Sequence, residues 1–123
     1  MEERDPLTER IIGCALTVHR TLGPGLLESA YEGAMCIELA TSGMRFDRQL
    51  LVPLLYREAR RGDYRIDLVV ESQVVVEIKS AQRYDPVFAA QVLTYLRVTG
   101  LHVGLLLNFG RPVLTAGIKR FAL

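Results

Sequence analysis

The sequence predicts a single α/β domain in which helices flank a mixed β-sheet, and three observations lead to this prediction. The 123 residues fit one domain, because most domains contain about 100–150 residues. Half of the residues are apolar and 24% are charged, which is typical of a globular core and excludes intrinsic disorder. Strand-like segments at 74–80 and 103–109 enclose a helix-like segment at 86–99, and such a crossover joins parallel strands.

Two helices are expected at the N-terminal end of the chain. The first covers residues 6–20, where Asp5 can cap the helix and Pro6 suits its first position. Its apolar residues recur at helical spacing until the Gly-Pro-Gly sequence at 23–25 ends it. The second helix covers about 26–41.

Three strands are expected next. Residues 46–56 form an extended segment, in which Pro53 favours an edge position or a β-bulge. Residues 57–63 are predicted to be a polar connection that contains three arginines. Residues 64–71 and 74–80 are predicted to form a hairpin.

One helix and two strands complete the predicted fold. The helix over 86–99 is started by Asp85 and ended by Gly100. The continuous apolar segment at 102–109 is typical of a strand that is buried on both faces. A last strand at 113–121 is expected at an edge of the sheet. The predicted order of elements is therefore ααβββαββ.

Charge and polarity limit the classes of function. The net charge of +1 argues against a strongly basic coat for nucleic acid, although it is compatible with a local basic groove. Apolar runs end well before the ~18 positions of a membrane-spanning helix. Residues 1–6 are polar and acidic, unlike a signal peptide, so the cytoplasm is the expected location. Cys14 and Cys36 fit neither a disulfide framework nor a zinc spacing, and reduced thiols are expected.

Two acidic residues of the predicted hairpin are expected to face each other. A turn centred on Ser72 pairs Asp67 with Glu77, and strand alternation places both side chains on one face. The same alternation places Ile66 and Leu68 together on the opposite face. Like charges opposite each other on adjacent strands are unfavourable. A divalent cation such as Mg²⁺ would reverse that effect, because it takes carboxylate oxygens as ligands.

Lys79 is expected on the same face as Glu77. Thirteen of the 15 basic residues are arginines, so a lysine at this position is unusual for the chain. Its ammonium could neutralise a developing negative charge or orient a water, and together with the acids and a metal it outlines hydrolysis of a phosphodiester. The alternative is an ordinary solvated face of a hairpin, on which Lys79 and Arg65 neutralise the acids.

Two pairs of helical residues extend this group. Gln91 and Tyr95 are four residues apart, Glu28 and Tyr31 are three apart, and each pair shares a helix face. Both pairs also have an ordinary structural interpretation. Gln91 would be an exposed residue beside a half-buried Tyr95, and Glu28 would be a glutamate that the helix dipole stabilises. The functional interpretation places Gln91 and Tyr95 over the acids, in contact with a phosphate backbone or with Lys79.

Several separated motifs resemble those of one known family. Residues 25–31 spell a GxxExxY sequence, and the segments 65–68, 77–79 and 108–110 match in order and spacing. Over nearly its whole length the chain resembles the GxxExxY proteins, which belong to the PD-(D/E)xK nuclease-like superfamily. The resemblance implies a restriction-endonuclease-like core, an αβββαβ mixed sheet flanked by helices. The single domain at 1–123 adds one N-terminal helix to that core.

The resemblance also implies a site. Asp67 and Glu77 would bind Mg²⁺ or Mn²⁺, with Glu28 as a third ligand that acts directly or through water. Lys79 would be the catalytic lysine, and the third helix would carry a Gln-x-x-x-Tyr motif. The six matching positions hold the expected residue types: Glu28, Asp67, Glu77, Lys79, Gln91 and Tyr95.

Two hypotheses follow for the function. In the first, the chain is a Mg²⁺- or Mn²⁺-dependent nuclease that hydrolyses phosphodiester bonds in DNA or RNA, and Tyr31 supports its site. Four arginines could contact flanking phosphates: Arg57, Arg60, Arg61 and Arg65. In the second, the chain is a non-enzymatic nucleic-acid-binding or assembly module that retains a nuclease-like site. A partner protein or a homo-oligomer would then supply target recognition, and the helix at 6–20 is the candidate interface.

Overall fold

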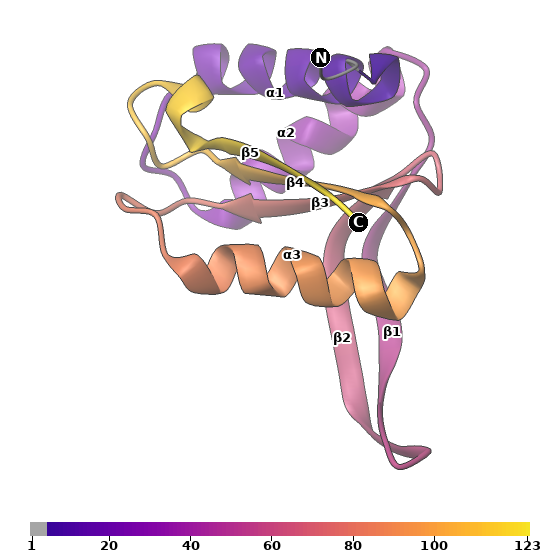
Figure 1. Cartoon of the computed structure of the whole chain (residues 1–123). Helices are drawn as coiled ribbons and strands as arrows, with labels where there is room; N and C mark the ends of the chain where they lie inside the picture. Colours follow the sequence, from indigo (N-terminus) through magenta and orange to yellow (C-terminus); the bar gives the residue numbers. More distant parts are fainter. Residues whose placement is uncertain (1–4) are drawn as a thin grey trace.

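The computed structural model describes residues 5–123, so residues 1–4 of the polar N-terminal stretch lie outside the described part. Figure 1 shows a layered α/β arrangement with two long strands that extend beyond the body. In chain order the elements are α1 (Pro6–Leu22), α2 (Glu28–Thr41), β1 (Phe46–Tyr56), β2 (Ala59–Val70), β3 (Val74–Lys79), α3 (Pro86–Thr99), β4 (Val103–Asn108), the 3₁₀ helix η1 (Leu114–Gly117) and β5 (Ile118–Ala122).

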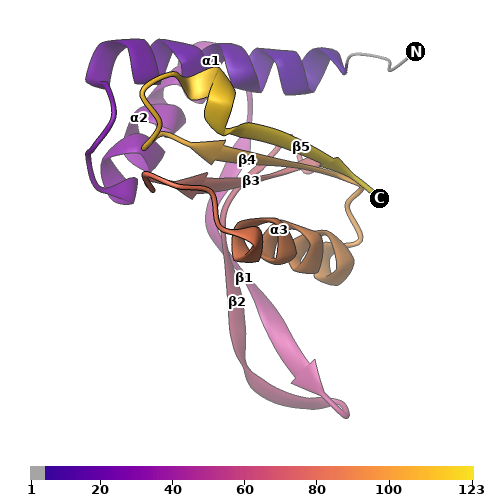
Figure 2. The same ribbon diagram turned by 60° about the vertical axis from the view of Figure 1, so that its left-hand side comes forward.

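The described strands form one five-stranded sheet in the order β1-β2-β3-β4-β5. β3 and β4 are parallel, and each of the other neighbouring pairs is antiparallel. Helices α1 and α2 cover one face of the sheet and α3 covers the other (Figures 1 and 2). This arrangement confirms the predicted mixed sheet, its β3-α3-β4 crossover and the additional N-terminal helix.

The predicted helix signals act as expected. The Asp5 side chain accepts a hydrogen bond from the Leu7 N–H at 3.1 Å, and Asp85 accepts one from Val87 at 2.9 Å. Gly100, with φ of 73°, ends α3 in the left-handed conformation that favours glycine. None of the helices within residues 5–123 is both long and apolar enough to traverse a lipid bilayer.

Two apolar clusters stabilise the domain, one on each face of the sheet. The first joins α1 and α2 to alternate strand residues such as Val76 and Ile78. The second joins Val92 and Leu96 of α3 to the opposite face, including Val75. Full burial of a single aliphatic side chain of this size stabilises a fold by about 1.5–3 kcal/mol. The second cluster is the smaller, and Glu77 lies on its side of β3.

The predicted polar connection at 57–63 is wrong. Tyr56 pairs with Ala59, so the connection is a two-residue turn, and residues 59–63 belong to β2. Arg57 and Glu58 have φ values of 50° and 67°, the conformation that a type I′ hairpin turn requires at both positions. Asparagine and glycine usually occupy such positions, so the sequence carries no turn signal there. The register shift next to Pro53 in edge strand β1 confirms the predicted bulge.

The last predicted strand is correct only in its second half. Residues 114–117 form a 3₁₀ helix that buries Leu114, and the edge strand β5 starts at Ile118. Gly117 packs against the backbone of Asn108, a close approach that a side chain would prevent. The chain therefore has to turn before it can pair with β4.

Strand alternation changes phase at Asp67, which the sequence did not predict. Leu68 packs in the cluster with α1 and α2, whereas Ile66 packs in the cluster with α3. The predicted common face for these two residues is therefore wrong. Opposite Asp67, residue Gln49 of β1 has φ of 53°, a left-handed conformation that interrupts the ladder. This irregularity lies where the candidate site begins.

Candidate active site

β2 and β3 separate at the position of Asp67. Their ladder is centred on Ser72, as predicted, but it ends at Leu68 and Val76, one residue before the expected 67/77 pair. The Oδ2 atom of Asp67 instead accepts a hydrogen bond from the Ile78 N–H at 2.8 Å. A carboxylate thus takes the position of a strand carbonyl, and this brings Asp67 next to Glu77.

Glu77 is buried beside Asp67, with only 4% of its surface exposed. Its Oε2 atom is buried and has no hydrogen-bond partner among the described residues. Burial raises the pKa of Glu77 to about 9, and the hydrogen bond and negative charge of Asp67 contribute to the rise. Glu77 is therefore protonated at neutral pH.

Lys79 lies half-buried at the end of β3. Its Nζ atom is 5.0 Å from the centroid of the Phe88 ring on α3, and its positive charge lowers the pKa of nearby Glu77. The face of an aromatic ring attracts an ammonium without supplying a lone pair. The contact with Phe88 therefore positions the amine beside the acids and leaves its hydrogen-bond donors available.

Glu28 lies at the N-terminus of α2 and contacts the end of β3. Its Oε2 atom accepts a hydrogen bond from the Ser80 N–H at 3.2 Å, and the Ser80 hydroxyl donates to Leu26 O at 2.5 Å. The charge of Glu28 also raises the pKa of Glu77. The structure therefore brings Glu28 to the same end of the sheet as Glu77 and Lys79.

Tyr31 is fully buried and holds the segment that precedes α2. Its hydroxyl donates to Gly23 O at 2.5 Å and accepts from the Leu26 N–H at 3.1 Å. Its ring stacks on Phe109, with centroids 4.6 Å apart. Complete burial excludes direct contact with nucleic acid and leaves Tyr31 the supporting role.

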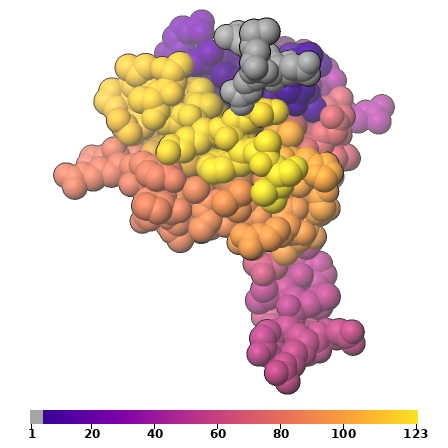
Figure 3. All heavy atoms as spheres, viewed as in Figure 1, coloured from indigo at the N-terminus to yellow at the C-terminus, as the bar shows by residue number. Residues whose placement is uncertain are grey.

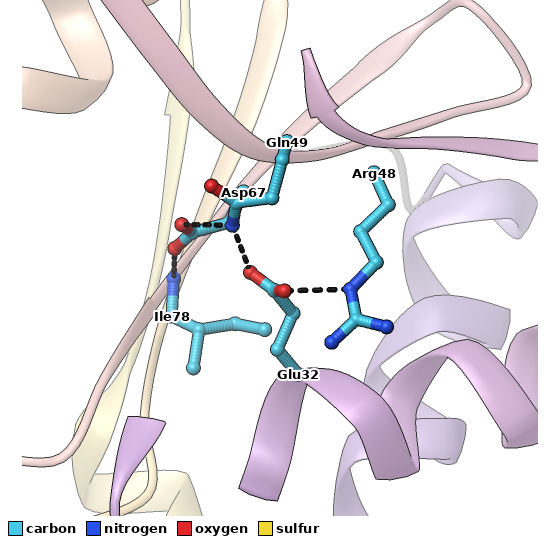
Figure 4. Close-up of polar contacts among 5 residues, drawn as sticks. All are labelled: Glu32, Arg48, Gln49, Asp67 and Ile78. Carbon is cyan, nitrogen blue, oxygen red and sulfur yellow. Dashed lines mark hydrogen bonds and ion pairs between the residues drawn. The ribbon is translucent and has the colours of Figure 1, made fainter. Parts of the chain in front are cut away.

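Glu32 is a residue of the site that the sequence reading missed. It is only 7% exposed, and its carboxylate accepts from Arg48 Nε at 2.7 Å and from Gln49 Nε2 at 2.5 Å. Gln49 Nε2 also lies 3.3 Å from Asp67 Oδ1, so the network reaches the candidate metal ligand (Figure 4). The sequence offered one signal for Glu32: it lies four residues after Glu28 and therefore on the same face of α2. The partners of Glu32 come from another strand, which periodicity does not reveal.

Gln91 and Tyr95 come from α3, which covers this side of the sheet. Burial raises the pKa of Tyr95 to about 12, and the negative charges of Glu77 and Asp67 and a hydrogen bond with Glu77 add to the rise. Tyr95 therefore lies against the acids. Gln91 is one turn earlier on α3, and its Oε1 atom is buried without a hydrogen-bond partner among the described residues.

The orphaned amide oxygen of Gln91 yields a prediction. An unsatisfied buried oxygen costs about 1–3 kcal/mol, so Gln91→Leu should leave the melting temperature unchanged or raise it. The role that the sequence predicts for Gln91 requires in addition that activity falls: its amide N–H would donate to a phosphate, and the orphaned oxygen would accept from a water. Thermal melts and cleavage assays on the same preparation test both statements. A destabilised variant with full activity would show that Gln91 is merely structural.

Asn108 holds the segment that follows Lys79. Its Oδ1 atom accepts from the Ala81 N–H at 2.9 Å and from the Gly110 N–H at 3.0 Å, and Asn108 is only 3% exposed. The Phe109 N–H donates to Lys79 O at 2.8 Å. The segment 108–110 therefore fixes the backbone around the lysine.

Asn108→Leu should destabilise the domain. Leucine has a similar size but no acceptor, so two partly buried N–H groups would lose their partner, at a cost of about 2–3 kcal/mol. Chemical denaturation followed by circular dichroism measures the change. Asn108→Leu with wild-type stability would mean that water replaces the lost acceptor.

Three of the four arginines predicted to contact phosphates lie away from the acids, whereas Arg65 is two residues from Asp67 on β2. Arg57, Arg60, Arg61 and Arg65 are all exposed on the long β1–β2 hairpin. Arg60 forms an ion pair with Asp63 at 2.5 Å, and the Arg57 guanidinium lies 5.9 Å from the Tyr56 ring centroid. Seven residues separate Arg60 from Asp67, which corresponds to roughly 20–25 Å of strand.

The oxygen-rich site fits a hard divalent cation. Asp67 and Glu77 supply adjacent carboxylates, and the orphaned Glu77 Oε2 is a buried donor atom that a cation would satisfy. Within residues 5–123, no three His, Cys, Asp or Glu side chains converge closely enough to bind an ion in this conformation. Glu28, which is bonded to Ser80, would have to act through water or move.

Comparisons with known proteins agree with this architecture. No curated protein and no solved structure gives a match. A family model described as the PD-(D/E)XK nuclease superfamily matches residues 5–121, nearly the whole chain. The chain therefore belongs to the PD-(D/E)XK nuclease superfamily.

Proposed function

We propose that this protein is a Mg²⁺- or Mn²⁺-dependent nuclease that hydrolyses phosphodiester bonds in DNA or RNA. One observation carries the proposal: Asp67 and Glu77 are held together with a buried, unpartnered carboxylate oxygen next to Lys79. Two adjacent carboxyl groups in a buried position are unfavourable without a cation. Membership in a nuclease superfamily supports this reading of the site.

Asp67 and Glu77 would hold the ion, with Glu28 as a third, water-mediated ligand. When bound, the ion would supply Lewis-acid polarisation of a phosphate oxygen and lower the pKa of a coordinated water. Glu77 has to lose its proton for this role, because a metal ligand must be deprotonated. The Asp67–Gln49–Glu32 network would keep the first carboxylate oriented.

Lys79 would stabilise the negative charge that develops on the phosphate and help to orient the attacking water. Phe88 keeps the ammonium next to the acids. Tyr95, which lies against the acids, would hold Glu77 in position, and the amide N–H of Gln91 would donate to the phosphate backbone while its buried oxygen accepts from a water.

Calorimetric titration of Mn²⁺ and Mg²⁺ tests the proposal without a choice of substrate. Wild-type protein should bind the ions and Asp67→Asn should not. Asp63→Asn is the matched control, because it makes the same change at an exposed acid on the β1–β2 hairpin. Absence of binding in the wild type would mean that the acids are structural or that nucleic acid has to complete the site.

An assembly module is the second candidate function, and one surface feature favours it. α1 and α2 form a hollow lined by residues that include Val18, Leu22 and Ile37, and Ile37 is 66% exposed. A second copy of the chain could cover this apolar surface. Native mass measurement tests the idea, and a clean monomer would remove it.

A further inference from the structure

Part of the β1–β2 hairpin leaves the body of the protein as an arm. The arm consists of residues 50–66, which continue beyond the point where β2 separates from β3; its base packs against α3 through residues such as the fully buried Ile66, and the remainder projects. Figure 1 shows it extending past α3, and the space-filling view in Figure 3 shows it as a separate projection. The two-residue turn at Arg57 and Glu58 keeps its tip narrow.

The arm carries the positive charge of the chain. It contains four arginines and two acids, Glu58 and Asp63, so its formal charge is +2. The whole chain has a charge of +1, so the remaining residues together carry −1. An elongated cationic element on a slightly acidic body is suited to a polyanionic partner.

The outer face of the arm combines arginines with exposed apolar side chains. Leu51 is 50% exposed and pairs with Arg65, and Leu55 is 61% exposed and pairs with Arg60. Arginine can contact phosphates and guanine edges, and an apolar side chain can contact the thymine methyl group. The same face therefore offers both kinds of contact that a groove of DNA presents.

We propose that the arm inserts into the major groove of double-stranded DNA and holds the duplex beside the candidate active site. The proposal rests on the proposed nuclease function, for which it names the substrate. The major groove of B-form DNA is about 12 Å wide and admits a two-stranded ribbon, whereas that of A-form RNA is too deep and narrow. The geometry therefore favours duplex DNA over duplex RNA.

The length of the arm sets a minimum length of substrate. A distance of roughly 30–33 Å from Asp67 to the tip spans about nine or ten base pairs at about 3.4 Å each. A duplex has to extend at least that far from the cleaved bond to reach the tip. Affinity should therefore rise with duplex length and then level off.

Binding assays with a matched pair of double variants test the proposal. In the arm variant, Arg60→Gln and Arg65→Gln remove the two charges of the face described above. In the control, Arg20→Gln and Arg97→Gln remove two charges from exposed positions on α1 and α3. Fluorescence anisotropy in EDTA measures affinity for a 20-bp DNA duplex, a 20-bp RNA duplex and single-stranded DNA. Melting temperatures verify that both variants fold.

The arm variant should bind duplex DNA about tenfold more weakly than the wild type, and the slope of log affinity against log salt should fall by up to about 2. The control should bind as the wild type does, and duplex RNA should bind more weakly than duplex DNA. Equal losses in the two variants, or equal affinity for the two duplexes, would overturn the proposal. So would a wild-type dimer that the arm variant converts to a monomer, because the arm would then hold a second copy.

Failure of the nuclease proposal gives a different result from failure of this one. Binding in EDTA depends on neither metal nor cleavage, so it measures the arm contact whether or not the protein is a nuclease. Arm-dependent binding without cleavage would leave the groove contact intact and remove the enzymatic function. Cleavage that continues unchanged when both arm arginines are replaced would support the nuclease function and remove the groove contact.

Discussion

Replacing Lys79 with alanine is expected to reduce metal-dependent cleavage by at least ~100-fold while the fold remains intact. Loss of one charged or hydrogen-bonding group that acts on the developing charge costs about 10²–10³ in rate. Lys79 is only half-buried and its amine contacts the Phe88 ring, so its removal leaves no buried charge without a partner. Cleavage rates at saturating Mn²⁺ measure the effect, and thermal melts verify the fold.

Lys119→Ala is the matched control for this experiment. Lys119 is the chain's other lysine, and its amine also lies over an aromatic ring, 3.9 Å from the centroid of Tyr84. That variant should keep most of the activity. If Lys79→Ala were fully active, the assignment of the catalytic lysine would be wrong, whatever the control showed.

Replacing Glu77 with glutamine should abolish cleavage and at the same time stabilise the metal-free protein. The pKa of Glu77 is about 9 in the folded protein, against an ordinary value of 4.5. Below pH 4.5 Glu77 is protonated in both the folded and the unfolded chain, so burying it carries no ionisation penalty and the stability of the fold is at its full value. Between pH 4.5 and 9 Glu77 stays protonated in the folded chain but is ionised in the unfolded chain. The free energy of unfolding of the wild type therefore falls by about 1.4 kcal/mol for each pH unit.

Glu77→Gln removes this pH dependence, because an amide does not titrate. The gain at pH 7 should be on the order of 3 kcal/mol, and it should grow towards pH 9. Denaturation curves at pH 5, 7 and 8.5 measure it, and Glu58→Gln at the exposed hairpin tip is the control. Mn²⁺ should stabilise the wild type more at pH 8 than at pH 6 and should not stabilise Glu77→Gln. A constant difference in stability between Glu77→Gln and the wild type across this pH range would contradict the raised pKa.

The sequence alone was sufficient for features that depend on local chemistry. Asp5 and Asp85 start helices because their side chains cap nearby N–H groups, and Gly100 ends one because it adopts a positive φ. The register about Ser72 followed from the alternation of the two strands that flank it. Each of these signals lies within a few residues of the structure that it predicts.

Features that depend on distant partners were not predictable in the same way. The length of the arm depends on Arg57 and Glu58 adopting positive φ values that their residue types do not favour. The burial of Glu32 makes sense only with Arg48 and Gln49, which come from a different element. The change of phase at Asp67 depends equally on the strand opposite it. Sequence reading thus identified the acids and the lysine but not the network that orients them.

The bond from Asp67 to the backbone of β3 affects how this domain could lose its chemistry during evolution. An inactive descendant would still need an acceptor at position 67 to satisfy the Ile78 N–H, and asparagine could supply it. Position 77 satisfies no backbone group in this way, and its buried Oε2 atom has no hydrogen-bond partner among residues 5–123. Drift after loss of activity should therefore replace Glu77 with an apolar residue first and leave Asp or Asn at position 67.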